Sequence, residues 1–375
     1  MKKIFVTAIA ILTMASASVF GMYGVDTDWI FFLTHGNQFR ARLDQLGFTL
    51  GNDMIKGTFG FDNNTGFGGI YGALLNKATT GDDYDWVPSI SMGIGYTSSL
   101  ISVGVGYNAT VGPRTPKFNG KDTPKRVNKS THTPVLVLNA MDNAFRMAIP
   151  IQVYVNNDKY PDILGGGKNS EMAVSVDSQF RYYTGLDMLP QIRLYLRYGL
   201  YQSEFTPSQG NKEKTKHAES FGFDFRLYFG SMVEEVALQP LVKLAYNTAL
   251  GKYHNFASVQ AVKAMNGAYN IEAVRYGTGV WNLTLMTALG LTANSDIVSI
   301  YLEPSLGLKV NQNGHALLKN VKEVYGLGYD VYAEIYITPL KNLEWYFEAS
   351  IGNVGDTPGV AFAGTTGITW YLPAL

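Results

Sequence analysis

Large apolar and polar residues alternate with a period of two along the run at 221–229, which reads FGFDFRLYF. Phe221, Phe223 and Phe225 fall on one face, and Asp224 and Arg226 fall on the other. A period of two is that of a β-strand, because successive side chains of a strand point to opposite faces. The run therefore predicts a strand with one strongly apolar face and one charged face.

The same alternation recurs in four other runs, at 145–155, 191–202, 297–309 and 343–351. Runs of this length suit a tilted strand that crosses a bilayer, whereas ordinary strands have about five or six residues. A soluble sandwich also alternates, but with shorter strands and a polar outer face. The polar face of these runs also carries tyrosine and glycine, as expected of a crowded, water-lined lumen.

The whole chain predicts an all-β fold, a transmembrane antiparallel up-and-down β-barrel of about 16 strands, with 14 as the alternative count. The glycines between 60 and 72 blur the pattern, so the earliest strands are the least defined. We expect the strands at 39–50, 54–61, 66–75, 89–97, 100–110, 133–141, 145–155, 171–183, 191–202, 219–230, 236–248, 277–291, 297–309, 328–338, 343–353 and 361–372.

The connections between these strands alternate in length. The long polar ones are expected at 76–88, 111–132, 156–170, 203–218, 249–276 and 310–327, and short ones such as Ser98–Ser99 separate them. Outer-membrane barrels have this asymmetry, with short periplasmic turns and long extracellular loops. Both chain ends are then expected on the periplasmic side.

The N-terminus has the pattern of an export signal. Lys2 and Lys3 precede an apolar stretch and a small-residue tail that ends near Gly21, so residues 1–21 are expected to be a signal peptide. Residues 22–38 form a short N-terminal segment, in which Thr27 could cap and Gly36 could end a short helix at or inside the barrel mouth. The barrel is expected to occupy 39–375.

Composition agrees with an exported membrane protein. Charged residues make up 16% of the chain, against about 25% in soluble domains. Without Lys2 and Lys3 the chain has 28 basic and 30 acidic residues, which offers no basic face for nucleic acid. The chain has no cysteine, which excludes disulfides, thiolate metal sites and a lipid anchor on cysteine.

Ionised residues on the polar faces are candidates to line the lumen. Their mixed signs suit a hydrated channel, although salt bridges that fill a closed barrel would explain them nearly as well. These candidates are Arg181, Arg193, Arg197, Asp224, Arg226, Lys243, Glu303, Lys309, Glu334, Glu344 and Glu348, and Asp177 shares their polar face.

One expected extracellular loop, 111–132, is strongly basic, with six basic residues against Asp122. Such a loop could bind anionic surface polysaccharide or fold inward and favour anions, or it could simply be solvated. Its basic residues are Arg114, Lys117, Lys121, Lys125, Arg126 and Lys129.

The final strand carries a weak assembly pattern. Thr365, Gly367, Trp370 and Leu372 fit a polar-x-Gly-x-x-aromatic-x-apolar arrangement that resembles the strand recognised by barrel-assembly machinery. An ordinary last strand explains the same residues, and the chain ends in Pro373-Ala374-Leu375 where such signals usually end in an aromatic residue.

No motif predicts catalysis, a cofactor or a metal site, so we expect no enzyme. Four of the five histidines (His132, His217, His254 and His315) fall in the expected outer loops, His35 falls near the N-terminus, and none has metal-ligand spacing. The run Gly165-Gly166-Gly167-Lys168 lacks the spacing of a phosphate-binding loop and is expected to be a flexible loop.

Three segments resemble the variable surface proteins of intestinal spirochaetes. They are the leader at 1–24, the stretch WIFFLTHGNQFRARLDQLGFTLGN at 29–52 and the closing GITWYL at 367–372. The resemblance spans the chain and implies a surface-exposed, variable antigen of the outer membrane that forms homo-oligomers. We expect outer-membrane lipid and host surface molecules or antibodies as partners. The expected function is a major surface antigen, with porin-like passive diffusion as a further activity suggested by the strand count and the lumen charges. Adhesion to host material or surface polysaccharide through the extracellular loops is the alternative function.

Overall fold

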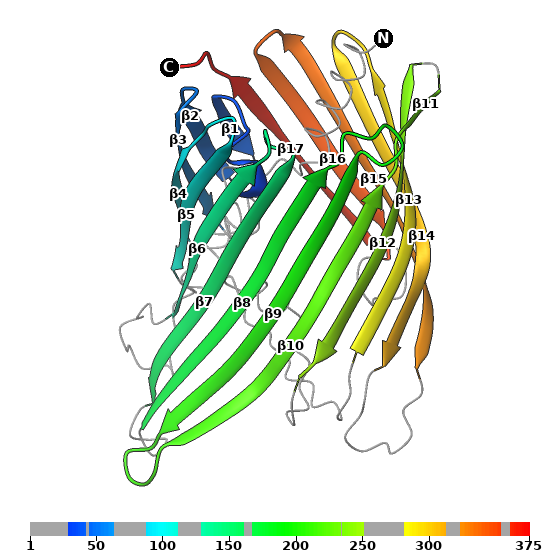
Figure 1. Cartoon of the computed structure of the whole chain (residues 1–375). Coiled ribbons are helices and arrows are strands. Elements are labelled where there is room, and N and C mark those ends of the chain that lie inside the picture. The colour runs from blue at the N-terminus through cyan, green and yellow to red at the C-terminus, as the bar shows by residue number, and fades with distance from the viewer. Residues whose placement is uncertain are drawn as a thin grey trace, which may run out of the picture.

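A computed structural model describes residues 29–42, 45–63, 88–111, 129–160, 167–233, 235–250, 281–312, 323–353 and 361–375. These residues form one short 3-10 helix and a single antiparallel sheet (Figure 1). The elements are η1 (Trp29–Phe31), β1 (Gln38–Arg42), β2 (Gln45–Gly51), β3 (Ile55–Asn63), β4 (Pro88–Tyr96), β5 (Ile101–Val111), β6 (Lys129–Ala140), β7 (Phe145–Tyr160), β8 (Gly167–Tyr183), β9 (Gln191–Thr206), β10 (Glu213–Tyr228), β11 (Ser231–Val233), β12 (Val236–Ala249), β13 (Trp281–Asn294), β14 (Val298–Gln312), β15 (Val324–Leu340), β16 (Leu343–Gly352) and β17 (Ala361–Tyr371).

The sheet closes on itself, because β1 pairs with β17 on one side and with β2 on the other. Each remaining strand pairs with its neighbour in the chain. The short β11 continues β10 after a break at Phe229 and Gly230, and both pair with β12. The ring is thus a closed antiparallel barrel of 16 strands, as the alternation predicts.

The count of 16 is reached with a different set of strands than the sequence predicts. The expected strand 39–50 is wrong: β1 ends at Arg42 and β2 starts at Gln45, so a hairpin occupies that stretch. The expected strand 66–75 lies outside the described residues. In the described part of the chain, β3 pairs directly with β4.

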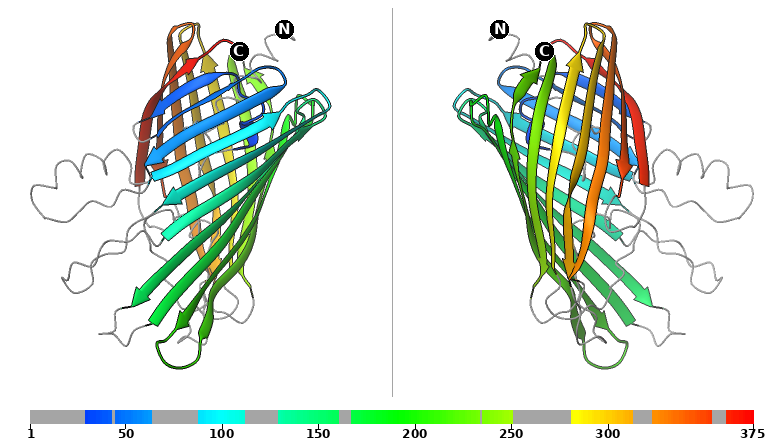
Figure 2. Two further views of the ribbon diagram at one scale, coloured as in Figure 1. Left: turned by 90° about the vertical axis from the view of Figure 1, so that its left-hand side faces the viewer. Right: turned by 90° about the vertical axis from the view of Figure 1, so that its right-hand side faces the viewer.

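The two rims differ, as Figures 1 and 2 show. Short turns such as 97–100 and 141–144 lie at the rim that also holds the C-terminus, where Leu375 N–H bonds to the carbonyl of Gly51. The strands that flank the long connections end at the opposite rim. Following the orientation expected from the sequence, we name the first the periplasmic rim and the second the outer rim.

Two of the expected outer loops prove to be mostly strand. β7 runs to Tyr160 and β8 begins at Gly167, and β9 and β10 likewise extend to Thr206 and from Glu213. The expected loops at 156–170 and 203–218 are therefore wrong in extent, because their polar residues continue the strands past the apolar belt. The same correction applies to His132 in β6 and His217 in β10, both of which lie in strands; His254 and His315 lie outside the described residues.

The outward face is an apolar belt. On β5 the outward residues Val103 and Val105 are 40% and 54% exposed, whereas the alternating Ser102 is 2% exposed. A soluble protein would bury such residues, and a barrel in a bilayer turns them to lipid. Among the described residues no helix is long and apolar enough to cross a membrane.

At the outer edge of the apolar belt, outward-facing tyrosines form hydrogen bonds with polar side chains. Tyr107 Oη hydrogen-bonds to His132 Nδ1 at 2.6 Å, and Tyr198 Oη donates to Glu219 at 2.6 Å. Glu219 also pairs with Lys216, and the next outward residue toward the periplasm is Phe221. Tyrosine suits this depth because its ring is apolar and its hydroxyl is wet.

Charge in the middle of the belt is expected to destabilise the barrel. Val105→Arg should lower the free energy of unfolding by about 2–4 kcal/mol, since it places a cation at the bilayer midplane. The matched control on the same strand is Val111→Arg near the outer rim, 41% exposed, with an expected loss of about 0–1 kcal/mol. Urea unfolding in lipid vesicles measures both values, and equal losses would contradict a lipid-facing belt.

Candidate functional site: the barrel lumen

The N-terminal segment lies inside the ring and not beside it. Trp29, Ile30, Phe31, Phe32 and Leu33 are all buried, between 0% and 3% exposed. They belong to one apolar cluster with residues from two separate parts of the wall, namely Val135, Val137 and Ala148 on β6 and β7, and Tyr336 and Tyr346 on β15 and β16. We call residues 29–37 the plug.

Glycines on the inward faces of β4 and β5 make room for the plug. A Cβ on Gly106 would lie 2.3 Å from Trp29 Cζ3, and one on Gly95 would lie 2.4 Å from Leu33 Cδ2. Gly93 and Gly104 are almost as close to the same two side chains. Separations below 3.0 Å do not occur between real atoms of this kind, so a Cβ at Gly93, Gly95 or Gly106 requires the plug or the wall to shift, and one at Gly104 requires a smaller adjustment.

Polar contacts fix the two ends of the plug. Asn37 Nδ2 donates to the carbonyls of Gly51 at 3.0 Å and Pro373 at 2.8 Å, which ties the plug to the periplasmic rim. Deeper in the lumen, the guanidinium carbon of Arg181 lies 4.4 Å from the centre of the Phe31 ring. Arg146 donates to Thr34 Oγ1 at 3.1 Å.

Acid is expected to loosen the plug through His35, which stacks on Phe31 with ring centres 5.4 Å apart. Burial, and then the charges of Arg40, Lys56 and Arg146, lower the pKa of His35 well below its ordinary value. The undocked histidine therefore takes up a proton more readily. The plug therefore binds the wall most strongly above the ordinary histidine pKa of about 6.5, and its binding weakens as the pH falls below that value.

Maleimide labelling of an Ile30→Cys variant measures this opening, because the chain has no other cysteine and Ile30 is 0% exposed. The labelling rate should rise as the pH falls, after correction for thiolate content. In the matched His35→Gln background that rise should disappear; a rise that persists would point to another titrating group.

A row of five cations crosses the wall on directly paired, inward-facing positions. Register pairs Arg146 with Arg181, Arg181 with Arg193, Arg193 with Arg226, and Arg226 with Lys243, over strands β7 to β12. Like charges on opposite positions destabilise a sheet. The arginines of the row stack on aromatic rings: Arg193 lies 4.2 Å from the ring centre of Tyr228.

Asp224 supplies counter-charge to the row, and Asp177 pairs with the neighbouring Arg197. Asp224, 1% exposed, accepts bonds from Arg226 Nε at 2.9 Å and Nη2 at 2.8 Å, and Lys243 Nζ lies 3.5 Å away. Arg197 bonds to Asp177 at 3.2 Å and reaches toward Asp224 at 4.0 Å. Asp224 is therefore shared by three cations.

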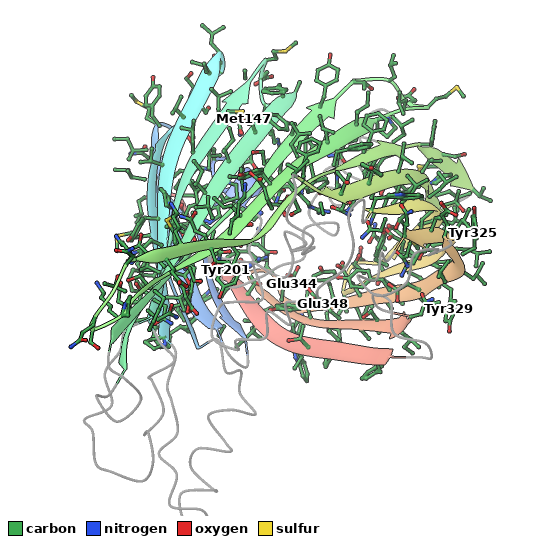
Figure 3. All side chains as sticks on the ribbon, turned by 90° about the horizontal axis from the view of Figure 1, so that it is seen from below. Met147, Tyr201, Tyr325, Tyr329, Glu344 and Glu348 are labelled. Atoms are coloured by element: carbon green, nitrogen blue, oxygen red, sulfur yellow. The ribbon has the colours of Figure 1, made fainter. Side chains whose placement is uncertain are left out.

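The acidic side chains gather on strands β14 to β16. Glu334 and Glu348 occupy paired positions, and tyrosine hydroxyls hold the carboxylates in this region. Tyr336 donates to Glu334 at 2.8 Å, and Tyr332 and Tyr301 donate to Glu334 and Glu303. Figure 3 shows Glu344 and Glu348 on the inside of the ring, with Tyr325 on its outer side.

The structure places all eleven lumen candidates on inward-facing positions, but in two different environments. Arg181, which contacts Phe31 of the plug, and its paired neighbour Arg193 are 2% and 5% exposed. Farther along the same row, the side chains of Arg226 and Lys243 are 23% and 29% exposed. The plug thus packs against β4–β8 and against Tyr336 and Tyr346 on β15 and β16. On β10 and β12 the side chains of Arg226 and Lys243 keep partial contact with water, whereas Asp224 and Glu334 are 1% exposed.

The other predicted residues are less informative. In the basic loop, Lys129 starts β6 and the rest lie outside the described residues. Thr365, Gly367 and Trp370 lie in β17, with Leu372 just after it. Within the described ranges no group of three or more histidines or acids could hold a metal ion.

Comparison with known families decides the assignment. The model of the Serpulina hyodysenteriae variable surface protein family matches residues 2–371, nearly the whole chain. The chain belongs to this variable surface protein family. Together with the lipid-facing barrel, membership makes this variable surface protein an outer-membrane β-barrel.

Other comparisons add little about this variable surface protein. A search of curated proteins finds no match. Among solved structures, the translocator domain of autotransporter NalP from Neisseria meningitidis is 12% identical over 90% of this chain and 89% of that chain, with a TM-score of 0.32. The transport unit of the autotransporter AIDA-I from Escherichia coli is 14% identical over 81% and 97%, with a TM-score of 0.28. Neither superposes closely enough to guide the assignment of lumen residues.

Proposed function

We propose that this variable surface protein is a porin-like channel whose lumen lets small hydrophilic solutes diffuse through the outer membrane, while its outer rim presents the antigenic surface. The observation that carries the proposal is the water-accessible charge on the inner wall at Arg226 and Lys243. By contrast, Arg181, which contacts Phe31 of the plug, is only 2% exposed. Barrels of about 16–18 strands also leave an aqueous channel.

The route to the membrane is part of the proposal. Residues 1–21 act as the signal peptide, and the barrel-assembly machinery recognises β17 through Thr365, Gly367 and Trp370. In the membrane the barrel forms homo-oligomers, and the cell surface displays its outer rim to host molecules and antibodies. The projection of β7–β10 beyond the apolar belt supports this display, since paired Lys212 and Glu204 lie there, 2.7 Å apart, with side chains 59% and 33% exposed.

Conductance of the purified protein in planar lipid bilayers tests the channel. We expect stepwise current increases in salt solution as single barrels insert. Heat-modifiable migration on a denaturing gel establishes that the sample is folded. A folded, inserted sample that gives no steps would reject the channel.

Adhesion through the outer rim is the alternative function, supported by the same projecting strands. Replacement of residues 112–128 by a short glycine-serine linker removes most of the basic loop and leaves the pairing of Val111 in β5 with Ser130 in β6 in place. If the protein is an adhesin through this loop, host-cell binding falls on replacement. Unchanged binding would count against it.

A further inference from the structure

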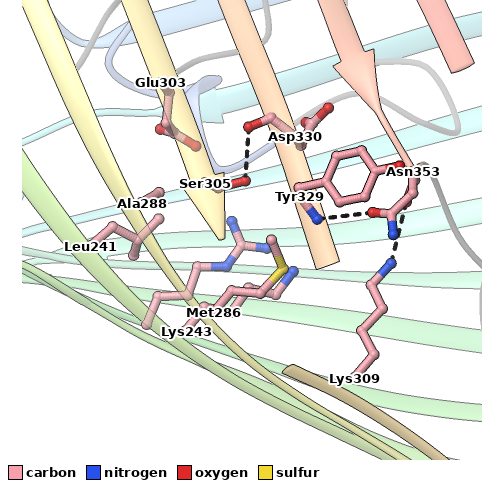
Figure 4. A pocket seen from close by; sticks show the side chains of 11 residues that line it. Leu241, Lys243, Met286, Ala288, Glu303, Ser305, Lys309, Tyr329, Asp330 and Asn353 are labelled. Carbon is pink, nitrogen blue, oxygen red and sulfur yellow. Dashed lines mark hydrogen bonds between the residues drawn. The ribbon is translucent and has the colours of Figure 1, made fainter. Parts of the chain in front are cut away.

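A cavity of about 260 Å³ lies against the inner wall, on the side of the ring where Arg226 and Lys243 keep contact with water. It is lined by residues of β10, β12, β13, β14 and β15 and by Asn353 after β16 (Figure 4). None of the described plug residues lines it. The cavity is therefore separate from the apolar cluster that holds the plug.

Register arranges part of the lining in two neighbouring rows of inward-facing positions. The first row runs from Arg226 to Lys243 and on to Met286. The second row lies two residues nearer the periplasmic rim, about 6.8 Å along the strands, and holds the paired Leu241 and Ala288. We call Leu241, Met286 and Ala288 the apolar patch, and it lies directly beside the two cations.

Arg226 and Lys243, which we call the cationic end of the cavity, have donors that their counter-charge leaves unused. Asp224 accepts hydrogen bonds from Nε and Nη2 of Arg226, and no hydrogen bond among the described residues uses Nη1. Lys243 Nζ lies 3.5 Å from the same carboxylate, farther than the roughly 2.7–2.9 Å of a good charge-assisted hydrogen bond. Because both side chains keep partial contact with water, an anion in the cavity can reach them.

Cations outnumber carboxylates at the cationic end. Arg197, Arg226 and Lys243 all lie within 4.0 Å of Asp224. In the described part of the chain only Arg197 has a second carboxylate, that of Asp177 at 3.2 Å. One positive charge therefore exceeds the carboxylates that surround it, and this excess complements a monovalent anion.

The carboxylates of the lining lie too far away to take the place of that anion. Glu303 lies on β14, four residues from the position that continues the first row, about 13 Å along the strand, and it accepts a hydrogen bond from Tyr301. Asp330 lies on β15, three strands from Lys243, about 14 Å across the sheet. Its Oδ1 packs against Gly352. Neither carboxylate reaches the cationic end.

Lys309, the third cation of the lining, extends away from the cationic end (Figure 4). Its Nζ donates to the carbonyl of Asn353 at 3.3 Å. Its Cε would lie 3.1 Å from a Cβ on Gly328, so the side chain runs across β15. Lys309 therefore lines the same cavity without contributing to the site at Arg226 and Lys243.

We propose that this cavity binds small monocarboxylates that carry a short alkyl chain. The carboxylate accepts hydrogen bonds from Arg226 Nη1 and Lys243 Nζ, and the alkyl chain lies on the apolar patch. A chain of about three carbons beyond the carboxylate, at about 1.5 Å per C–C bond, covers most of the distance between the two rows. A phosphate or sulfate ion would use the cations but leave the apolar patch without a partner.

The inference rests on the proposed channel for its biological role, but binding tests it without any conduction. Saturation-transfer NMR of the folded protein in deuterated detergent compares butyrate with acetate and butyramide. We expect butyrate to bind with a dissociation constant on the order of 1 mM. Acetate should bind about fifteenfold more weakly, because it lacks two methylene groups. Butyramide should bind at least about tenfold more weakly, because it lacks the charge.

Variants separate the contributions of the cationic end and the apolar patch. Lys243→Gln should weaken butyrate binding about tenfold, through the loss of one charge-assisted hydrogen bond. Met286→Gln should weaken butyrate binding severalfold and leave acetate binding unchanged. Lys309→Gln removes the same charge at the other end of the cavity and is the matched control. It should change butyrate binding less than about twofold in about 0.1 M salt, which screens charges beyond about 10 Å.

Heat-modifiable migration checks that each variant is folded. Equal binding of butyrate and butyramide, or equal weakening by Lys243→Gln and Lys309→Gln, would overturn the carboxylate site whatever the conductance. Equal binding of butyrate and acetate, or full displacement of butyrate by equimolar phosphate, would overturn the proposed ligand class. Selective butyrate binding by a protein that gives no current steps would keep the site and remove the channel, and current steps without butyrate binding would do the reverse.

Discussion

The Asp224→Asn variant is expected to unfold with a free energy about 3 kcal/mol lower than that of the unmodified protein. Asp224 is 1% exposed and is the shared counter-charge of Arg226, Lys243 and Arg197. The amide has the same shape but no charge, so three neighbouring cations are left to repel one another. We place the value at the low end of the range for a broken buried pair because Arg226 and Lys243 keep some contact with water.

The matched control is Glu204→Gln, which breaks the exposed pair with Lys212 at the outer hairpin. Exposed pairs contribute about 0–1 kcal/mol. Urea unfolding in vesicles, followed by tryptophan fluorescence, gives both values. In bilayers Asp224→Asn should also shift the reversal potential toward anion preference, since the lumen gains one positive charge. Equal stability of the two variants would mean that the cation row is not held by Asp224.

The barrel could be predicted from the sequence because its pattern is dense and local. Residues 221–229 show both faces in one run, and the structure turns Phe221, Phe223 and Phe225 outward while Asp224 faces in. The positions of the strand ends could not be predicted. A change from apolar to polar residues along a strand shows where the strand leaves the lipid, but the backbone hydrogen bonds between strands can continue beyond that point. Glu204 and Lys214 are polar, yet they pair within the β9–β10 ladder.

For residues 22–38 the sequence predicts a short helix at or inside the barrel mouth, and it does not decide between these two positions. Trp29 to Leu33 are apolar, but sequence alone does not say whether an apolar segment lies in lipid, on a rim or inside a lumen. A signal was present in the inward positions of β4 and β5, where Gly93, Gly95, Gly104 and Gly106 alternate with apolar residues. Glycine repeated on the face of a strand that should carry polar side chains indicates that something packs against the backbone.

The sequence also does not predict that the five cations of the row occupy paired positions. Arg146, Arg181, Arg193 and Arg226 are far apart along the chain, and no local rule fixes which residues face each other across a hairpin with extended strands. Register depends on the turn at each rim. The turn at 184–190 brings Arg181 opposite Arg193, and shifting β8 by one residue would turn Arg181 toward lipid.

Adding two methyl groups to the inner wall is expected to displace the plug and leave the barrel intact. In the Gly95→Ala, Gly106→Ala double variant the new Cβ atoms would lie 2.4 Å from Leu33 and 2.3 Å from Trp29. The strands can accept alanine, since neither glycine has a positive φ, so the plug must move. Arg146 and Arg181 then lose their contacts with Thr34 and Phe31 and line open water.

Two measurements follow the displaced plug independently. In the Ile30→Cys background the maleimide labelling rate should rise by on the order of tenfold or more, because exposure of a buried thiol needs local opening. Single-channel conductance should rise roughly twofold as the part of the lumen beside β4–β8 fills with water. Gly57→Ala on β3 is the matched control, because its Cβ would have no neighbour closer than 3.9 Å. Faster labelling at unchanged conductance would mean that the plug does not limit the conductance of the pore. An unchanged labelling rate would mean that strands β4 and β5 shift to accept the two methyl groups while the plug stays in place.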